Sequence, residues 1–105
     1  MNTICPKECK HKMEVDDSVH VIDIREDFEY DFCNIGCKNI PMQTLLDTSD
    51  DLDSSNTYIL MCQTGKRAHA LANLLKCEKG LQNIIVMEGG IENWKEKNDP
   101  SLILE

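Results

Sequence analysis

A strand, a tight turn and a helix follow one another within residues 57–75, and this unit constrains the fold more than any other part of the sequence. Thr57–Met61 is a short apolar run with β-branched and aromatic side chains, which predicts a buried strand. After Cys62 and the turn Gln63–Arg67, a helix is predicted from apolar residues at helical spacing: Ala68, Leu71, Ala72 and Leu75. The Cys62 thiol is therefore expected at a helix N-terminus, where backbone N–H groups favour an anion.

Predicted strands and helices alternate along the rest of the chain. Further strands are expected at Val19–Ile24 and Ile84–Met87, with brief extended segments ending near Ile4 and at Ile35–Pro41. Helices are expected from Pro6 to about Met13, at Glu26–Phe32, at Met42–Leu46, from Ala68 to a cap at Gly80, and at Ile91–Lys97, with a solvated acidic loop at Asp47–Asn56. The alternation implies right-handed crossovers and a mainly parallel sheet covered on both faces. Ligands of such sheets bind at the carboxyl ends of strands, and Cys62 follows one of these ends.

Length and charge limit the partners that the chain can have. A length of 105 residues suffices for one core, so residues 1–105 are interpreted as a single domain. The 19 acidic and 11 basic residues give a net charge of -8, which argues against binding to nucleic acid or to an anionic membrane. We expect a monomer.

Hydropathy and cysteine usage predict a cytoplasmic protein. No apolar run approaches the ~18 residues of a membrane span, and the first residues do not follow the pattern of a secretion signal. In a reducing compartment, the six cysteines are expected to be free thiols rather than a disulfide framework.

The turn after Cys62 is suited to holding a thiolate. Gly65 allows a positive φ, so that consecutive N–H groups can point into one concavity. The helix adds partial positive charge, and Lys66 and Arg67 add full charges on an otherwise acidic chain. A lone cysteine is more often a small buried hydrophobe, but these neighbours favour a nucleophilic thiolate at Cys62.

Four segments, in order and at suitable separations, resemble signatures of the rhodanese-like sulfurtransferases, and the resemblance covers most of the chain. The segments are Val21–Glu26 with Glu29 and Tyr30, Gly36 with Asn39–Pro41, Cys62–Arg67, and Gly89–Ile91 with Trp94. The resemblance implies a three-layer α/β fold with a mainly parallel central sheet of about five strands and helices on both faces.

The resemblance also implies a chemistry. Cys62 would accept a sulfane sulfur, become a persulfide and pass the sulfur to a thiophilic acceptor. Thiosulfate or a protein persulfide would be the donor, a sulfur-carrier protein is a possible acceptor, and no cofactor or metal is expected. Backbone N–H groups of the loop would cradle the outer sulfur, while Lys66 and Arg67 steer an anionic donor; the loop residues are Gln63, Thr64, Gly65, Lys66 and Arg67.

The loop length favours sulfur over phosphate as the transferred group. Four residues separate Cys62 from Arg67, whereas phosphatases of related architecture place five between their Cys and Arg. The smaller ring fits a sulfur atom better, so we prefer sulfur transfer to phosphatase or arsenate-reductase chemistry on the geometry of the site rather than on the fold.

Other polar residues and cysteines leave alternatives open. Asp23 and Arg25, at the end of a strand, either support the Cys62 loop through hydrogen bonds or pair with each other and with Glu26 on the surface. The stretch Cys33–Cys37 replaces the His-Ile-Pro-Gly-Ala that the family often has. Its two thiols are a redox pair, a resolving thiol for a Cys62 persulfide, half of a metal site, or packing groups, and packing is preferred. Cys5, Cys9 and His11 suggest zinc, but a structural site needs a fourth ligand, so packing is preferred there and at Cys77.

Two rival functions remain from the sequence. One is a carrier of narrower scope that receives sulfur from a partner's persulfide for cofactor biosynthesis or tRNA thiolation. The other is a non-catalytic binding or redox-sensing module with the same fold, against which the presence of Cys62, Gly65 and Arg67 argues.

Overall fold

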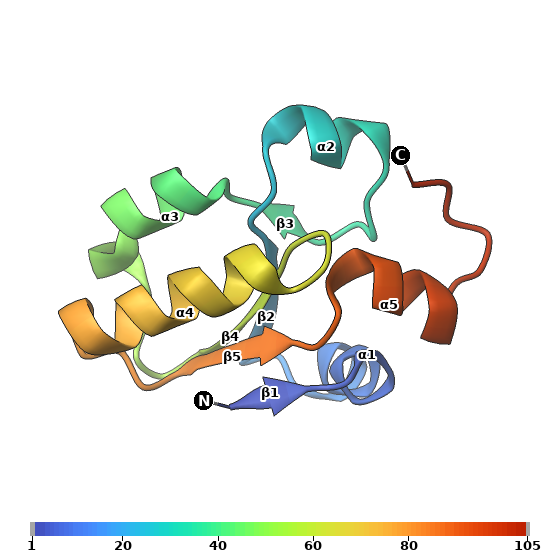
Figure 1. The fold of residues 1–105 in the computed structure, drawn as a ribbon. Helices are drawn as coiled ribbons and strands as arrows, with labels where there is room; N and C mark the ends of the chain where they lie inside the picture. The colour runs from blue at the N-terminus through green and yellow to red at the C-terminus, as the bar shows by residue number, and fades with distance from the viewer. Residues whose placement is uncertain (1, 105) are drawn as a thin grey trace.

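Five parallel strands form one sheet in the computed structural model, which describes residues 2–104 (Figure 1). The sheet order is β1-β5-β4-β2-β3, so the two longest strands, β2 and β4, lie side by side near its centre. The strands span Thr3–Ile4 (β1), Val19–Asp23 (β2), Lys38–Asn39 (β3), Thr57–Met61 (β4) and Ile84–Met87 (β5). The predicted mainly parallel α/β sheet of about five strands is confirmed.

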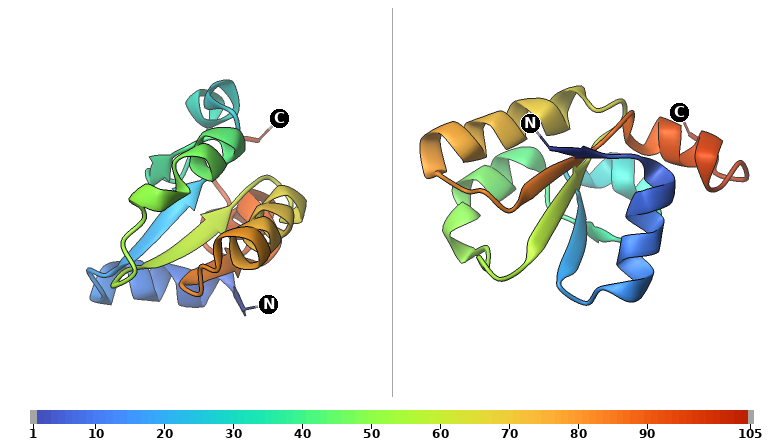
Figure 2. Two further views of the ribbon diagram at one scale, coloured as in Figure 1. Left: turned by 90° about the vertical axis from the view of Figure 1, so that its left-hand side faces the viewer. Right: turned by 90° about the horizontal axis from the view of Figure 1, so that it is seen from below.

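Helices cover both faces of this sheet, which gives the three layers that were predicted. In Figure 2, α3 and α4 lie on one side of the strands and α1 and α5 lie on the other, while Figure 1 shows α2 beyond the carboxyl end of β2. The helices span Pro6–Val15 (α1), Asp27–Phe32 (α2), Met42–Asp47 (α3), Lys66–Lys79 (α4) and Gly90–Lys97 (α5), with a 3-10 turn, η1, at Ser49–Asp51.

The alternation of side chains along β4 divides the core into two parts. Tyr58 and Leu60 pack with the apolar residues of α3 and α4, and Ile59 and Met61 pack with those of α1 and α5. This arrangement follows from the period of two along a strand. Because both faces of β4 are buried, its sequence is a continuous apolar run rather than an alternating one.

One predicted loop is partly wrong. Asp47–Asn56 was expected to be a solvated acidic loop, and its acidic residues are indeed exposed. However, η1 continues the end of α3 through bonds from the Asp51 N–H to the Thr48 carbonyl and from the Leu52 N–H to the Ser49 carbonyl. Ser49 is buried, and Leu52 returns to the core beside α4. Local hydrogen bonding at a helix end gave little signal in such a polar sequence.

Within residues 2–104, every helix is too short or too polar to cross a membrane.

Two thiols outside the Cys62 loop are wholly or partly buried by this packing. Cys9 of α1 is fully buried in the part of the core that α1 and α5 cover, and Cys37 packs against the same cluster just before β3. Burial raises the pKa of Cys9 to about 12, with a smaller contribution from Cys5. Burial, together with the nearby charge of Asp23, also raises the pKa of Cys37 to about 12. Both side chains are therefore protonated and inert at neutral pH.

We predict that iodoacetamide at pH 8 labels the exposed Cys5 and Cys77 while Cys9 and Cys37 stay unmodified. With a pKa of about 12, roughly one buried thiol in ten thousand is ionised at that pH. Peptide mass spectrometry of a time course measures the four rates. Labelling of Cys9 or Cys37 as fast as Cys77 in the folded protein would contradict the packing described above.

Candidate active site

The Cys62 sulfur lies at the bottom of a loop whose backbone N–H groups point toward it. Cys62 follows β4 directly and only 1% of it is exposed. Its Sγ accepts hydrogen bonds from the N–H of Gly65, at 3.1 Å, and from the N–H of Ala68, at 3.4 Å. Donors from the loop and from the first turn of α4 thus converge on one atom, which stabilises negative charge there.

Glycine at position 65 is required by the shape of this loop. Gly65 has φ +102° and precedes the first residue of α4. That backbone conformation is strained for any residue with a Cβ. The sequence analysis expected this turn, and the structure adds that Gly65 also lies against the backbone of Gly89, 3.4 Å from where a Cβ would stand.

The N-terminus of α5 holds the loop from behind. The N–H of Ile91 donates to the Cys62 carbonyl at 2.8 Å, and the N–H of Glu92 donates to the Gln63 carbonyl at 3.2 Å. Gly90 has φ +64°, and a Cβ there would lie 2.4 Å from both carbonyl oxygens. Gly90, which the sequence analysis identified only as part of the signature Gly89–Ile91, therefore positions the loop that carries Cys62.

A buried ion pair supports the same loop from β2. Asp23 is fully buried and Arg25 is 2% exposed. The Arg25 guanidinium donates to both oxygens of the Asp23 carboxylate, with a 2.9 Å contact from Nη2. Its Nη1 donates to Gln63 Oε1 at 3.2 Å, and its Nη2 donates to the Cys33 carbonyl at 2.7 Å. The structure therefore contains parts of both alternatives: Asp23 and Arg25 pair with each other, but in the interior rather than on the surface, and Arg25 also donates to Gln63 of the Cys62 loop.

Arg67 has a carboxylate partner that the sequence analysis did not identify. Its guanidinium forms two bonds with Glu29 of α2, at 2.7 and 3.0 Å. The hydrogen bond from Arg67 lowers the pKa of Glu29, and the same bond raises the pKa of Arg67. The Glu29 charge offsets the positive charge that the sequence alone assigned to the site. Nothing in the sequence pattern indicated this contact, because it joins residues 38 positions apart.

Thr64 and Lys66 are exposed, and Gln63 is half-buried at the entrance to the site. The Gln63 amide donates to Glu92 Oε2 at 3.2 Å, so that both ends of this side chain are held. Of the predicted site residues, Asp23, Arg25 and Gln63 are thus joined by hydrogen bonds, Gly65 bonds to Cys62, and Arg67 bonds to Glu29, whereas Thr64 and Lys66 are exposed.

A cavity of about 390 Å³ opens beside Gln63, and we call it the mouth pocket. Residues of β2, α2, the Cys62 loop, α5 and the C-terminal segment line it: Arg25, Phe28, Glu29, Phe32, Cys33, Gln63, Glu92 and Leu104. Cys33 therefore faces the mouth pocket, whereas its predicted partner Cys37 is partly buried and lines a different cavity; both are free thiols.

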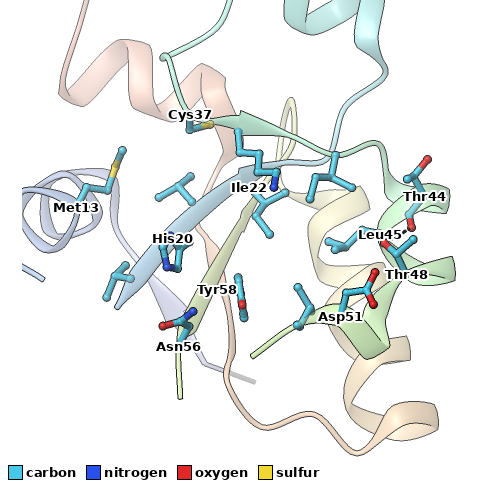
Figure 3. A pocket seen from close by; sticks show the side chains of 15 residues that line it. Met13, His20, Ile22, Cys37, Thr44, Leu45, Thr48, Asp51, Asn56 and Tyr58 are labelled. Carbon is cyan, nitrogen blue, oxygen red and sulfur yellow. Dashed lines mark hydrogen bonds between the residues drawn. The ribbon is translucent and has the colours of Figure 1, made fainter. Parts of the chain in front are cut away.

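A larger cavity, of about 700 Å³, lies elsewhere, along the first part of β2, before the residues that pair with β3 (Figure 3). Figure 3 shows Met13 of α1 on one side of it, Leu45 and Thr44 of α3 on the other, and His20 and Tyr58 at its floor. No residue of the Cys62–Arg67 loop lines it. Although this cavity is larger than the mouth pocket, its position away from the loop gives it no part in chemistry at Cys62.

Residues 2–104 contain no group of three or more His, Cys, Asp or Glu side chains placed to hold a metal ion. Cys5 is exposed and Cys9 is buried, so the zinc alternative at Cys5, Cys9 and His11 has no assembled ligand set in the part of the chain that the structure describes.

Comparison with known proteins identifies the family. The rhodanese-like domain matches residues 6–97. The chain is 30% identical, over 87% of each chain, to YtwF of Bacillus subtilis (strain 168), a protein provisionally named a sulfurtransferase. It is 26% identical, over 86% of its length, to YrkF of the same organism, provisionally named a sulfur carrier protein, and spans only 49% of that relative. The crystal structure of a rhodanese-related protein from Thermoplasma volcanium matches with a TM-score of 0.81, at 29% identity and with both chains fully covered.

We predict that Arg25→Met lowers the free energy of unfolding by about 3–5 kcal/mol, because it leaves the buried Asp23 carboxylate without its partner. Urea denaturation measures the change. Arg67→Met, which breaks a more exposed pair, is the matched control and should cost about 0–1 kcal/mol. Replacing both buried partners, in Asp23→Leu with Arg25→Met, should recover much of the loss. Equal costs for Arg25→Met and Arg67→Met would mean that the buried pair is not the support described above.

We also predict that Gly90→Ala lowers stability by more than about 2 kcal/mol, because the new Cβ meets the carbonyls of Cys62 and Gln63 in addition to the strain of a positive φ. Gly80→Ala is the control, since Gly80 has a similar φ of +68° and open space around it. It should cost about 1 kcal/mol. Thermal unfolding of both variants tests the contact with the loop, and similar losses at the two positions would count against it.

Proposed function

Because the chain belongs to the rhodanese-like domain family, we propose that it is a sulfurtransferase in which Cys62 carries the sulfur as a persulfide. The names of its relatives, a sulfurtransferase and a sulfur carrier protein, agree with a role in sulfur transfer. The observation that carries the proposal is the convergence of the Gly65 and Ala68 N–H groups on Cys62 Sγ. The same donors that stabilise a thiolate would stabilise the terminal sulfur of a persulfide.

The first half-reaction loads the loop. The Cys62 thiolate attacks the sulfane sulfur of the donor, a bond forms between the two sulfurs, and the bond between that sulfur and the donor breaks with its electron pair. Thiosulfate would leave as sulfite, and a protein persulfide would leave as a thiolate. The transferred sulfur keeps its oxidation state, so the step needs no external oxidant.

The second half-reaction returns the enzyme to its starting state. A thiophilic acceptor attacks the outer sulfur, and Cys62 leaves as a thiolate. Because a stabilised thiolate is a good leaving group, the hydrogen bonds to Sγ favour this step as well as the first. Arg25 and the α5 N-terminus have a positioning role in both steps, since they hold the Gln63 side chain and the carbonyls of Cys62 and Gln63.

Within this proposal, residues 1–105 act as one domain in the cytoplasm. Lys66, an exposed residue of the Cys62 loop, would attract an anionic donor. The reaction uses no cofactor. A sulfur carrier or a protein persulfide is a partner by analogy with the relative named as a sulfur carrier protein.

We predict that thiosulfate or cysteine persulfide adds one sulfur atom, about 32 Da, to the reduced protein at Cys62. Cys62→Ser should take up none, and it should lose transfer of sulfur to cyanide by a factor of about 1,000 or more. Intact-mass spectrometry and a thiocyanate assay give the two readouts. Cys77→Ser, which removes an exposed thiol far along α4, is the matched control and should behave as the unmodified chain does.

Equal turnover by Cys62→Ser and the unmodified protein would disprove the mechanism. If neither donor loads Cys62 in the folded, reduced protein, the alternative of a non-catalytic binding or redox-sensing module would replace it.

A further inference from the structure

We propose that α2 and the C-terminal segment beside it form a docking surface for a protein that delivers the persulfide, and that this protein presents an apolar side chain flanked by lysines or arginines. The inference rests on the proposed function and names the class of its donor. Its basis is the apolar residues, the charges and the cavity found together beside Gln63.

The first observation is a cluster of exposed apolar side chains at the mouth pocket. Phe28 is 65% exposed and Phe32 is 56% exposed, although both are large aromatic residues one helical turn apart on α2. Both line the mouth pocket together with Leu104, and the neighbouring Ile103 is 74% exposed. Figure 1 shows the C-terminal segment running from α5 back toward α2. Three of the four large apolar residues found exposed in the described chain thus lie at or next to one cavity.

We call Phe28, Phe32 and Leu104 the α2 patch. Exposed aromatic pairs of this kind are a cost to a monomer in water, and patches bordered by polar residues are typical of sites that bind another protein. The α2 patch also adjoins Gln63, the residue that follows Cys62, so a protein bound there lies next to the proposed sulfur-carrying loop.

The second observation is the sign of the charge around the patch. The segment Glu26–Phe32 carries four carboxylates and no basic residue. Glu26, Asp27 and Asp31 are exposed, and Glu92 lies across the mouth pocket. A partner with basic residues around an apolar anchor would be complementary to this surface and would be attracted by the net charge of -8.

The third observation is that both arginines of the site are already paired. Arg25 is bound to Asp23, and Arg67 is bound to Glu29. The mouth pocket contributes two carboxylates, Glu29 and Glu92, against the single guanidinium of Arg25. A small dianion such as thiosulfate therefore gains little electrostatic attraction on approach from this side, whereas a cationic protein surface is attracted most strongly there.

The transfer itself follows the first half-reaction with the protein as donor. The Cys62 thiolate attacks the outer sulfur of the partner's persulfide, the partner's sulfur–sulfur bond breaks, and the partner leaves as a thiolate. The proton of the donor persulfide remains on the transferred sulfur. One sulfur–sulfur bond is lost and one is formed, so atoms, charge and electrons balance without a co-reactant.

The test uses two synthetic peptide persulfides of equal length, each with one leucine and one cysteine persulfide. Lysines flank the leucine in the first, and glutamates flank it in the second. Cysteine persulfide is the third donor. Intact-mass spectrometry of the reduced chain of residues 1–105 gives the rate at which Cys62 gains sulfur from each donor at low ionic strength.

We expect the basic peptide to load Cys62 about ten-fold or more faster than the acidic peptide, and this ratio to fall toward one in ~0.5 M salt. Asp27→Lys with Asp31→Lys sets two lysines against the remaining Glu26 and Glu92, so it should bring the ratio close to one. Phe28→Ser with Phe32→Ser should reduce the advantage of the basic peptide over cysteine persulfide. The matched controls are Asp50→Lys with Asp51→Lys on η1 and Val15→Ser on α1, where Val15 is as exposed as Phe28, and both should keep the preference of the unmodified chain.

Two failures are distinguishable. If cysteine persulfide loads Cys62 but the two peptides load it equally or not at all, the docking surface is disproved while the sulfurtransferase proposal stands. The same conclusion follows if the controls on η1 and α1 change the preference as much as the substitutions on α2. If no donor loads Cys62, the proposed function itself fails.

Discussion

The buried pair of Asp23 and Arg25 is the interaction on which the candidate site depends. One guanidinium binds the end of β2 through Asp23, the Cys62 loop through Gln63, and the segment after α2 through the Cys33 carbonyl. Arginine suits this position because its planar group offers several donors in fixed directions. Desolvating both charges is costly, so the pair is better understood as a device that fixes the geometry of three segments than as a source of stability.

The loop that this pair supports is built almost entirely from the backbone. N–H groups of Gly65 and Ala68 face the sulfur, and N–H groups of Ile91 and Glu92 hold the carbonyls on the other side. Two side chains of the loop are also held: Gln63 bonds with Arg25 and Glu92, and the charge of Arg67 is engaged by Glu29 rather than left open toward the sulfur.

The elements and the position of Cys62 could be predicted from the sequence because their signals are local. The apolar run Thr57–Met61 and the glycine after Cys62 each act within a few residues. Support of the loop by Arg25 was one of two alternatives from the sequence, but its partner Gln63 could not be named, and the contact between Arg67 and Glu29 was not predicted, since each contact joins residues 38 positions apart. The exposure of Phe28 and Phe32 could not be predicted either, because two aromatic residues one helical turn apart usually indicate a helix face that packs on the core.

The hydrogen bond that holds the Cys62 carbonyl also fixes an order of events during synthesis of the chain. Its donor, the Ile91 N–H, lies 29 positions further along the chain, and β5, which precedes it, must first insert between β1 and β4. Contacts between residues so far apart in sequence form late, because closing the intervening loop costs conformational entropy. The strand and helix around Cys62 can appear early on the ribosome, but the loop reaches its final geometry only when the last helix has emerged. A truncated or stalled chain would expose this cysteine without the enclosure that controls its reactivity.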